Sequence, residues 1–246
     1  MASTEDSSIT ILLNDGKGHF KAAAGSPFFA NRFPNDIGIA DFNGDGNLDL
    51  ATDSWGENKV VVIFGDKDMG FGGETSYLVG NRPYQRLRAA DLNGDGKADI
   101  VTTNLEGNNA TVLLGQGDGK FREAEGSPFD CGSAPFGVAI GDVNGDGMGK
   151  FHPMKGSPFA TGKSPSRLAI GDLNGDKIND IAVTNYNDGS ISIFYMGKTG
   201  VEKIKTMRVG NRPDGICIGD FNKDGKNDIV VSNFDDGTIT LLFNTR

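Results

Sequence analysis

The fold of this chain is decided by the stretch Asp41-Phe42-Asn43-Gly44-Asp45-Gly46-Asn47-Leu48-Asp49, which has the pattern Asp-x-Asn-x-Asp-x-x-x-Asp. The same pattern recurs, once without its last aspartate, in stretches that begin at Asp91, Asp142, Asp172 and Asp220. Oxygen-bearing side chains at alternate positions, closed by a carboxylate, can converge on a hard cation such as calcium. Because the pattern recurs along the chain, it predicts a repeat architecture as well as a metal site.

Short apolar segments surround each copy in a constant order. Around the first copy, strands are expected at 37–40, 48–52, 59–64 and about 74–78, separated by turns rich in Gly, Asn and Asp. Helical periodicity is missing. Four short strands per repeat of about 50 residues are typical of a propeller blade. We therefore predict an all-β fold, a β-propeller of four-stranded blades, with about five blades in one domain over residues 1–246.

The third repeat is shorter than the others, because only 30 residues separate Asp142 from Asp172. Its metal-loop stretch runs directly into Phe151, so the equivalents of strands two and three are missing. We expect a truncated third blade of roughly two strands. Natural drift and a deleted segment both explain the gap.

The two ends of the chain carry similar segments, 9–14 and 239–244, which both resemble a third strand. The last blade lacks a fourth strand, and the segment 19–22 could supply it and so remove an exposed sheet edge. If the ring stays open instead, the free edge favours oligomers.

Each loop is expected to hold one cation through positions one, three, five and nine and through the backbone carbonyl of position seven. The predicted calcium ligands, about four ions in all, are Asp41, Asn43, Asp45, Asn47 and Asp49; Asp91, Asn93, Asp95, Lys97 and Asp99; Asp172, Asn174, Asp176, Ile178 and Asp180; and Asp220, Asn222, Asp224, Lys226 and Asp228. Glycine at position six allows a sharp turn, and Lys177 in the fourth loop predicts a strained one. The third loop has Lys150 at position nine, and we expect it to bind weakly or not at all.

Two alternatives to a calcium loop are weaker. An EF-hand requires a glutamate at position twelve and flanking helices, and the sequence has neither. Asx-turns without metal remain the second alternative. Four loops with three carboxylates each would repel at short range without a cation, which favours the metal.

Composition excludes several functions. The net charge is −9 without basic clusters, which argues against nucleic-acid binding. No apolar run approaches the roughly 18 residues of a membrane span, and a signal peptide is expected to be absent or removed. The two cysteines do not make a disulfide scaffold. We predict no catalytic residues, because His19 and His152 fall on expected fourth strands and no catalytic triad or phosphate loop occurs.

The repeated Asp-x-Asn-x-Asp-Gly-x-x-Asp motif, followed by an apolar strand that ends in Phe64-Gly65, resembles the FG-GAP or VCBS-type repeat. This repeat forms the blades of integrin α-subunit-like calcium-binding β-propellers. The resemblance implies calcium loops on one face and a role in adhesion or ligand binding outside the cell. Some relatives are lectins, and some repeats lie beside enzymes. Complete members often have seven blades.

A ligand site is expected at the end of the blades opposite the metal loops, where aromatic and arginine residues gather in the connections. The candidates are Trp55, Arg82, Arg88, Tyr186, Arg212 and Phe234. The alternative is that these residues only close the repeats. The sequence thus predicts a non-catalytic, extracellular binding or adhesion module for a glycan or a protein. A polysaccharide-active enzyme on the same scaffold and a purely structural repeat fragment are the other hypotheses.

Overall fold

The computed structural model describes residues 1–30, 32–68, 70–144 and 151–245 of the 246-residue chain. The chain forms two compact units, Met1–Val138 and Ala139–Arg246, which are described separately below. Both units consist of antiparallel sheets, and no helix occurs in the part of the chain that the structure describes. The same residues therefore contain no helical membrane span. The all-β prediction is confirmed.

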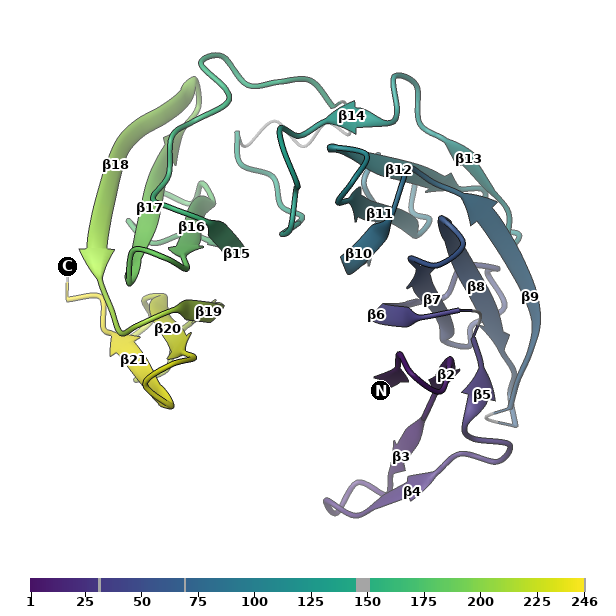
Figure 1. Cartoon of the computed structure of the whole chain (residues 1–246). Coiled ribbons are helices and arrows are strands. Elements are labelled where there is room, and N and C mark those ends of the chain that lie inside the picture. Colours follow the sequence, from purple (N-terminus) through teal and green to yellow (C-terminus); the bar gives the residue numbers. More distant parts are fainter. Residues whose placement is uncertain (31, 69, 145–150, 246) are drawn as a thin grey trace. The chain divides into compact units, whose positions relative to one another are not determined.

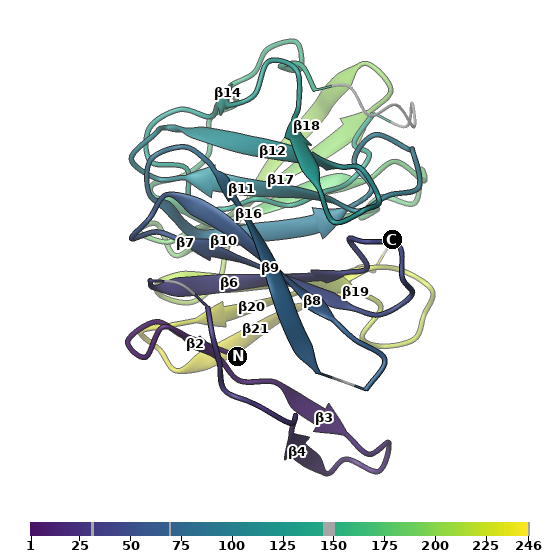
Figure 2. The same cartoon turned by 90° about the vertical axis from the view of Figure 1, so that its right-hand side faces the viewer.

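Two sheets of the N-terminal unit have the strand order of a blade, with each strand paired to the next along the chain (Figure 1). The first contains β6 (Pro34–Ala40), β7 (Asp49–Ser54), β8 (Lys59–Gly65) and β9 (Phe71–Leu78). The second contains β10 (Pro83–Ala90), β11 (Asp99–Asn104), β12 (Asn109–Gly115) and β13 (Phe121–Glu123), and β14 (Phe129–Asp130) also pairs with β12. Figure 2 looks onto β9, the fourth and outermost strand of the first sheet.

The first 30 residues form short strands beside the first blade. One sheet contains β1 (Ala2–Ser3), β2 (Ser8–Ile9) and β5 (Phe28–Phe29), and a hairpin contains β3 (Leu12–Asn14) and β4 (Phe20–Ala22). The segment expected to complete the last blade thus pairs with β3. The short hairpin connection lets β4 pair locally, and the pairing of this segment with the last blade stays a prediction.

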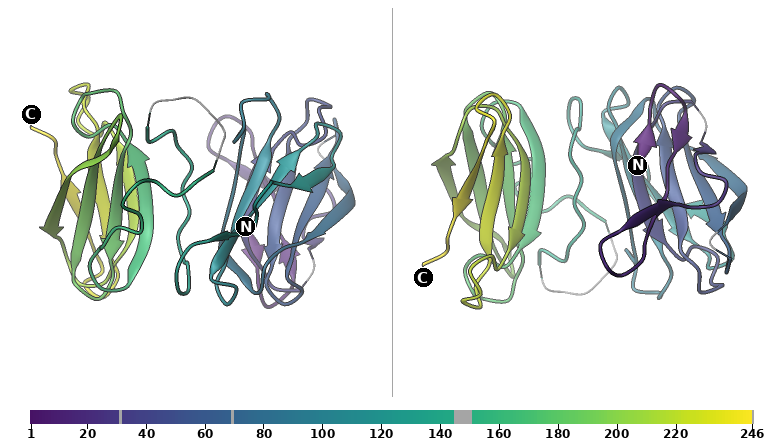
Figure 3. Two further views of the ribbon diagram at one scale, coloured as in Figure 1. Left: turned by 90° about the horizontal axis from the view of Figure 1, so that it is seen from above. Right: turned by 90° about the horizontal axis from the view of Figure 1, so that it is seen from below.

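Two sheets form most of the C-terminal unit and lie face to face (Figure 3). The four-stranded sheet contains β15 (Pro165–Gly171), β16 (Asp180–Asn185), β17 (Ser190–Gly197) and β18 (Gly200–Arg208). The other contains only β19 (Pro213–Gly219), β20 (Asp228–Asn233) and β21 (Thr238–Leu242). The predicted absence of a fourth strand from this blade is confirmed among the described residues.

The third repeat is truncated, as predicted, and more severely than expected. Its described residues, 131–144 and 151–164, contain no strand. The segment equivalent to a first strand, 135–141, has no second strand to pair with, because the chain lacks that part of the repeat. An isolated strand leaves its backbone N–H and C=O groups unpaired and therefore does not persist.

The core lies between neighbouring blades, which explains why the second strands of the N-terminal unit are buried on both faces. Every residue of β7 and β11 is buried. In the N-terminal unit, Val60 and Val62 of the first blade pack with Ile100 and Leu113 of the second. The C-terminal unit repeats this arrangement with Ile191 and Ile193 against Ile229. Inter-blade packing thus holds the strand ends, and the loops they carry, in fixed positions.

Candidate functional site

The nine-residue loops connect the first and second strands of each blade and fold around their first aspartate. In loop one, the Asp41 carboxylate accepts hydrogen bonds from the amides of Gly44 at 2.7 Å and Gly46 at 2.8 Å. Asp91 accepts equivalent bonds from Gly94 and Gly96, both at 2.8 Å. The backbone of each loop therefore wraps one carboxylate and holds it at the mouth of the loop.

Positions three to seven continue this wrapping. The amide of Asp45 donates to Asn43 Oδ1 at 2.9 Å, and the amide of Asn47 donates to Asp45 Oδ1 at 2.8 Å. These are Asx-turns, which set the loop conformation locally. Position six has φ of +86° at Gly46 and +71° at Lys177. The predicted strain in loop four is thus a lysine held in a left-handed conformation.

Position nine has a structural role that the sequence did not reveal. Asp49 is fully buried; its Oδ2 accepts the amide of Phe42 at 2.8 Å and its Oδ1 accepts the amide of Gly65 at 2.8 Å. The carboxylate thereby ties the end of the first strand to the end of the third. Asp99, Asp180 and Asp228 make the same pair of contacts in their own blades.

The pKa values of the loop aspartates shift in different directions according to their position in the loop. Burial raises the pKa of Asp49, Asp99 and Asp180 above the ordinary aspartate range, and carboxylates earlier in each loop raise it further. The pKa of Asp91 is lowered, because the amide of Gly96 stabilises its charge. Each of these three loops therefore combines one buried carboxylate with exposed carboxylates beside it.

The donor set of loops one, two, four and five fits a hard cation in its chemistry. Each loop offers only oxygen ligands, and none of the twelve carboxylates has a lysine or arginine within ion-pair distance among the described residues. The carboxylates bond to their own loop amides, and no three acidic side chains in the described ranges already form a coordination shell. An oxygen atom that accepts one amide bond retains a lone pair for a cation.

Loop three is only partly described. Asp142 Oδ1 accepts the amide of Asn144 at 3.2 Å. The remaining predicted features, at Asp146 and Lys150, lie outside the described residues. The backbone carbonyl of Asp142 accepts a bond from Asn179, and that of Asp172 accepts one from Asn227. The asparagine at position eight of loops four and five thus fastens each of them to the loop before it, a link that the sequence analysis missed.

At the opposite end of the N-terminal unit, the structure brings Trp55 and Arg82 together. The Arg82 guanidinium carbon lies 4.6 Å from the centroid of the Trp55 ring, and the guanidinium also pairs with Glu106. The Trp55 ring is half-buried and packs on Phe33 and Tyr84. Its Nε1–H is buried and has no partner among the described residues. The sequence carries a signal for Phe33 and Tyr84, which the sequence analysis did not single out. Each lies beside the proline that begins the first strand of a blade, Phe33 before Pro34 and Tyr84 after Pro83.

The C-terminal unit repeats this contact with Tyr186 and Arg212. The guanidinium carbon lies 5.3 Å from the Tyr186 centroid, and Arg212 forms an ion pair with Asp235 at 3.2 Å. Phe234 is 68% exposed on the same connection, so its ring is available to a ligand. The predicted set therefore divides between the two units.

Arg88 belongs to a different cluster, on the inner strands. It pairs with Asp36 at 2.8 Å, and Arg86 lies 4.0 Å from the same carboxylate. Next to Asp36, the fully buried Asp53 accepts the amides of Asn35 and Asp36 through Oδ1. The sequence analysis missed Asp53, although its equivalents, Thr103, Thr184 and Ser232, are uncharged.

Comparison with protein families identifies the class. The model of the FG-GAP-like repeat matches residues 1–52, 91–149 and 172–231, which is more than half of the chain. The chain therefore belongs to the FG-GAP-like repeat family, and its four-stranded antiparallel sheets are β-propeller blades. A comparison with curated proteins finds no significant match.

Many solved structures resemble the chain, and three of them illustrate the likeness. The Vibrio cholerae biofilm matrix protein Bap1 is 17% identical, with 97% of this chain and 37% of that chain covered and a TM-score of 0.52. A provisionally assigned 6-phosphogluconolactonase from Bacteroides fragilis NCTC 9343 is 17% identical, with 98% and 82% covered and a TM-score of 0.54. An auxiliary nutrient binding protein from Bacteroides ovatus ATCC 8483 is 10% identical, with 93% and 51% covered and a TM-score of 0.49. The chain spans about half the length of the last of these, and identities this low relate folds and not activities.

Proposed function

We propose that this chain is a non-catalytic calcium-binding propeller module that binds a glycan or a protein outside the cell. One observation carries the calcium part. Four loops hold an oxygen-only donor set around a buried position-nine carboxylate, and no lysine or arginine forms an ion pair with their carboxylates among the described residues. Calcium would neutralise these carboxylates and fasten the first and second strands of each blade.

The ligand part rests on the connections at the opposite end of the blades. Connections on a rigid scaffold commonly carry binding residues. In the N-terminal unit, the buried Trp55 N–H has no acceptor among the described residues, and the ring lies in a cluster of aromatic and arginine side chains. Aromatic rings stack on sugar faces, and arginine and tyrosine anchor protein ligands. The Bap1 likeness supports the scaffold only.

The calcium part is tested by a charge change at position five. Asp95 is exposed and bonds within its own loop, so Asp95→Asn removes a ligand charge without breaking the core. We expect calcium to raise the melting temperature of the parent chain by mass action, and to raise that of Asp95→Asn less. Asp130→Asn, an equal charge change on β14, serves as the control and should respond as the parent does. A melting temperature that is unchanged over millimolar calcium in the parent would contradict the proposal.

The ligand part is tested by Trp55→Ala combined with Arg82→Ala. Binding to glycan arrays and extracellular proteins should be lost, while the calcium-dependent melting shift persists. The matched double variant in the other unit, Tyr186→Ala with Arg212→Ala, shows which connection carries the ligand. Binding that survives in both double variants would place the site elsewhere. Turnover of polysaccharides by the parent chain would contradict the non-catalytic proposal.

A further inference from the structure

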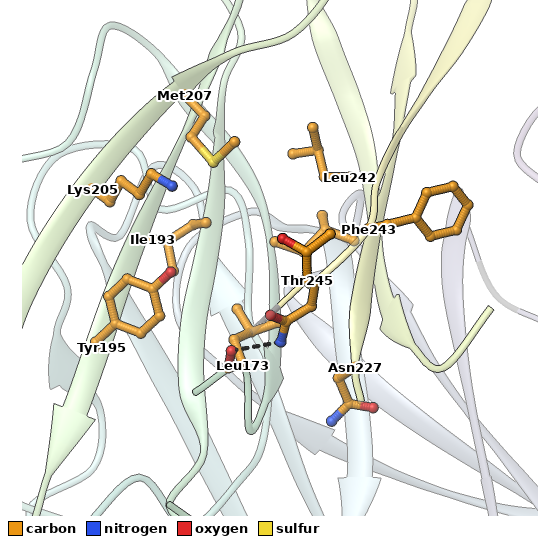
Figure 4. Close-up of a pocket in the computed structure, with 11 residues that line it drawn as sticks. Leu173, Ile193, Tyr195, Lys205, Met207, Asn227, Leu242, Phe243 and Thr245 are labelled. Carbon is orange, nitrogen blue, oxygen red and sulfur yellow. Dashed lines mark hydrogen bonds between the residues drawn. The ribbon is translucent and has the colours of Figure 1, made fainter. Parts of the chain in front are cut away.

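Two asparagines connect the neighbouring nine-residue loops of the C-terminal unit. The side-chain amide of Asn227, at position eight of loop five, donates to the backbone carbonyl of Asp172 at 2.9 Å. The side-chain amide of Asn244 donates to the next carbonyl, that of Leu173, also at 2.9 Å. Figure 4 shows this second bond as a dashed line at Leu173. Both acceptors lie at the start of loop four.

Both donors are tied to predicted calcium ligands of loop five. Asn227 stands between Lys226, whose carbonyl is the predicted ligand at position seven, and Asp228, the predicted ligand at position nine. The backbone amide of Asn244 donates to Oδ1 of the same Asp228 at 2.8 Å. A cation held by the residues on both sides of Asn227 would therefore restrict the donors that reach loop four.

The first acceptor residue carries the first predicted ligand of loop four. The Asp172 carboxylate accepts the amides of Gly175 at 2.6 Å and Lys177 at 2.9 Å, so loop four folds around this side chain. The bond from Asn227 holds the backbone of the same residue. The position of this ligand thus depends on loop five as well as on loop four.

The N-terminal unit lacks both links. Ala98 stands at position eight of loop two, where loop five has Asn227. Gly115 stands at the place of Asn244, because the backbone amides of both donate to the position-nine aspartate of their own blade. Neither alanine nor glycine has a side-chain donor. The carbonyl of the second residue of loop one accepts a backbone amide from the connection between β12 and β13 instead.

The residue before the first aspartate of a loop also differs between the units. It is Gly171 ahead of loop four, and a Cβ atom built there would lie 2.8 Å from the Cγ2 atom of Ile218 in the next blade. The corresponding residue ahead of loop one is Ala40, which carries a Cβ atom. Glycine thus lets the last two blades approach closely where the asparagines link their loops.

We propose that loops four and five bind calcium cooperatively, with Asn227 and Asn244 as the positioning residues that couple them. Loops one and two lack this coupling. The inference rests on the calcium binding proposed above. A cation in loop five orders the two donors, so less conformational freedom remains to be lost when loop four closes around its own cation. Coupling between two sites is reciprocal, so calcium in loop four strengthens binding in loop five by the same factor.

Calcium affinity at the two loops can be measured separately in the full chain. The amide resonances of Gly175 and Gly225 report on loops four and five during a calcium titration. Asp224→Asn removes a ligand charge from loop five, and we expect it to raise the calcium Kd of loop four about threefold, since hydrogen bonds carry the coupling. An unchanged Kd of loop four would overturn the coupling alone. Absence of any calcium-dependent shift in the parent would overturn calcium binding itself and the coupling with it.

A double-mutant cycle assigns the coupling to the two asparagines. In a chain that carries Asn227→Ala and Asn244→Ala, the further change Asp224→Asn should leave the calcium Kd of loop four unchanged. Asn179→Ala is the matched control, because this position-eight side chain reaches Asp142 and not loop five. The threefold effect should persist in that control. A threefold effect that survives without Asn227 and Asn244 would overturn their role.

Loops one and two provide the comparison within the same chain. Asp95→Asn in loop two should leave the calcium Kd of loop one, followed through the Gly46 amide, unchanged, because Ala98 cannot donate a hydrogen bond. A threefold effect on loop one would show that coupling does not require the asparagines, and would overturn the proposal.

Discussion

At the scale of single residues, Asp53 combines full burial with a negative charge. Burial raises its pKa to about 6, the amides of Asp36 and Asn35 partly oppose this shift, and the nearby Asp36 carboxylate adds to it. Its Oδ2 atom has no hydrogen-bond partner among the described residues. A neutral threonine or serine at the same position of other blades also accepts an amide of the first strand. In the second blade, the equivalent Thr103 hydroxyl has no hydrogen-bond partner among the described residues. The charge of Asp53 is therefore not needed at this position.

This comparison predicts how Asp53→Asn changes the free energy of unfolding with pH. The folded-state pKa is raised, so the folded chain binds more protons than the unfolded chain between about pH 4 and pH 6, and stability falls as pH rises through this window. Asp53→Asn keeps an acceptor for both amides and removes the charge. The variant should be more stable than the parent at pH 7, by about 3 kcal/mol at most, and equally stable below about pH 4. Urea titrations at several pH values measure the difference; one that did not change with pH would contradict the assignment.

Lys177 supplies a second prediction at this scale. Its φ of +71° places a lysine where the other fully described loops have glycine. Lys177→Gly should raise the free energy of unfolding by up to about 1 kcal/mol in calcium-free buffer, because glycine adopts this conformation without steric cost. Lys226→Gly, at a neighbouring loop position without positive φ, is the control and should be neutral or destabilising. Equal changes in the two variants, measured by thermal melting, would argue against strain at Lys177.

At the scale of elements, glycines at the end of the third strand let the nine-residue loop close over it. A Cβ atom built on Gly115 would lie 2.2 Å from the carbonyl oxygen of Ala98, and one on Gly65 would lie 2.2 Å from that of Leu48. The amides of both glycines also donate to the position-nine aspartate of their blade. The loop and the third strand therefore touch backbone to backbone at this point.

Gly115→Ala should destabilise the chain by several kcal/mol, since a contact with backbone atoms cannot be relieved by a side-chain rotation. Gly72→Ala is the matched control, because its Cβ would meet nothing within 4 Å on the exposed strand β9. We expect Gly72→Ala to change the free energy of unfolding by less than about 1 kcal/mol. Chemical denaturation of the two variants gives the comparison. A Gly115→Ala variant as stable as Gly72→Ala would contradict the close approach.

The sequence predicted the strands well where the same order of apolar segments recurs in more than one repeat. The apolar segments around Asp41 and Asp91 became strands, and the loops lie between the first and second strands as expected. The pairing of β4 was not predictable, because a segment that resembles a fourth strand can pair with either third-strand copy.

The buried contacts of Asp49 were not predictable either. A ligand motif does not show which backbone amides surround it in the fold.

At the scale of the molecule, the described chain is two units of blades, and the truncated third repeat contains the boundary between them. The sequence showed the truncation from the spacing of Asp142 and Asp172. It did not show that the remaining segment forms no strand. The sequence identified aromatic and arginine residues in the connections as ligand candidates. In the structure, Arg82 contacts the Trp55 ring and Arg212 contacts the Tyr186 ring, so each ring already has a partner within the chain. Whether a side chain on a connection is exposed depends on packing between blades, which repeat spacing does not reveal.

The central claim is that four of the repeated loops bind calcium, and a count of bound ions tests it most directly. Equilibrium dialysis or calorimetry at neutral pH, after removal of metal with a chelator, gives the number of sites. Extracellular calcium modules commonly have Kd values of about 10⁻⁴–10⁻³ M, so millimolar calcium is required. The account predicts about four ions per chain, and about three for Asp95→Asn. No bound calcium at millimolar concentration, in a chain that circular dichroism shows to be folded, would contradict it.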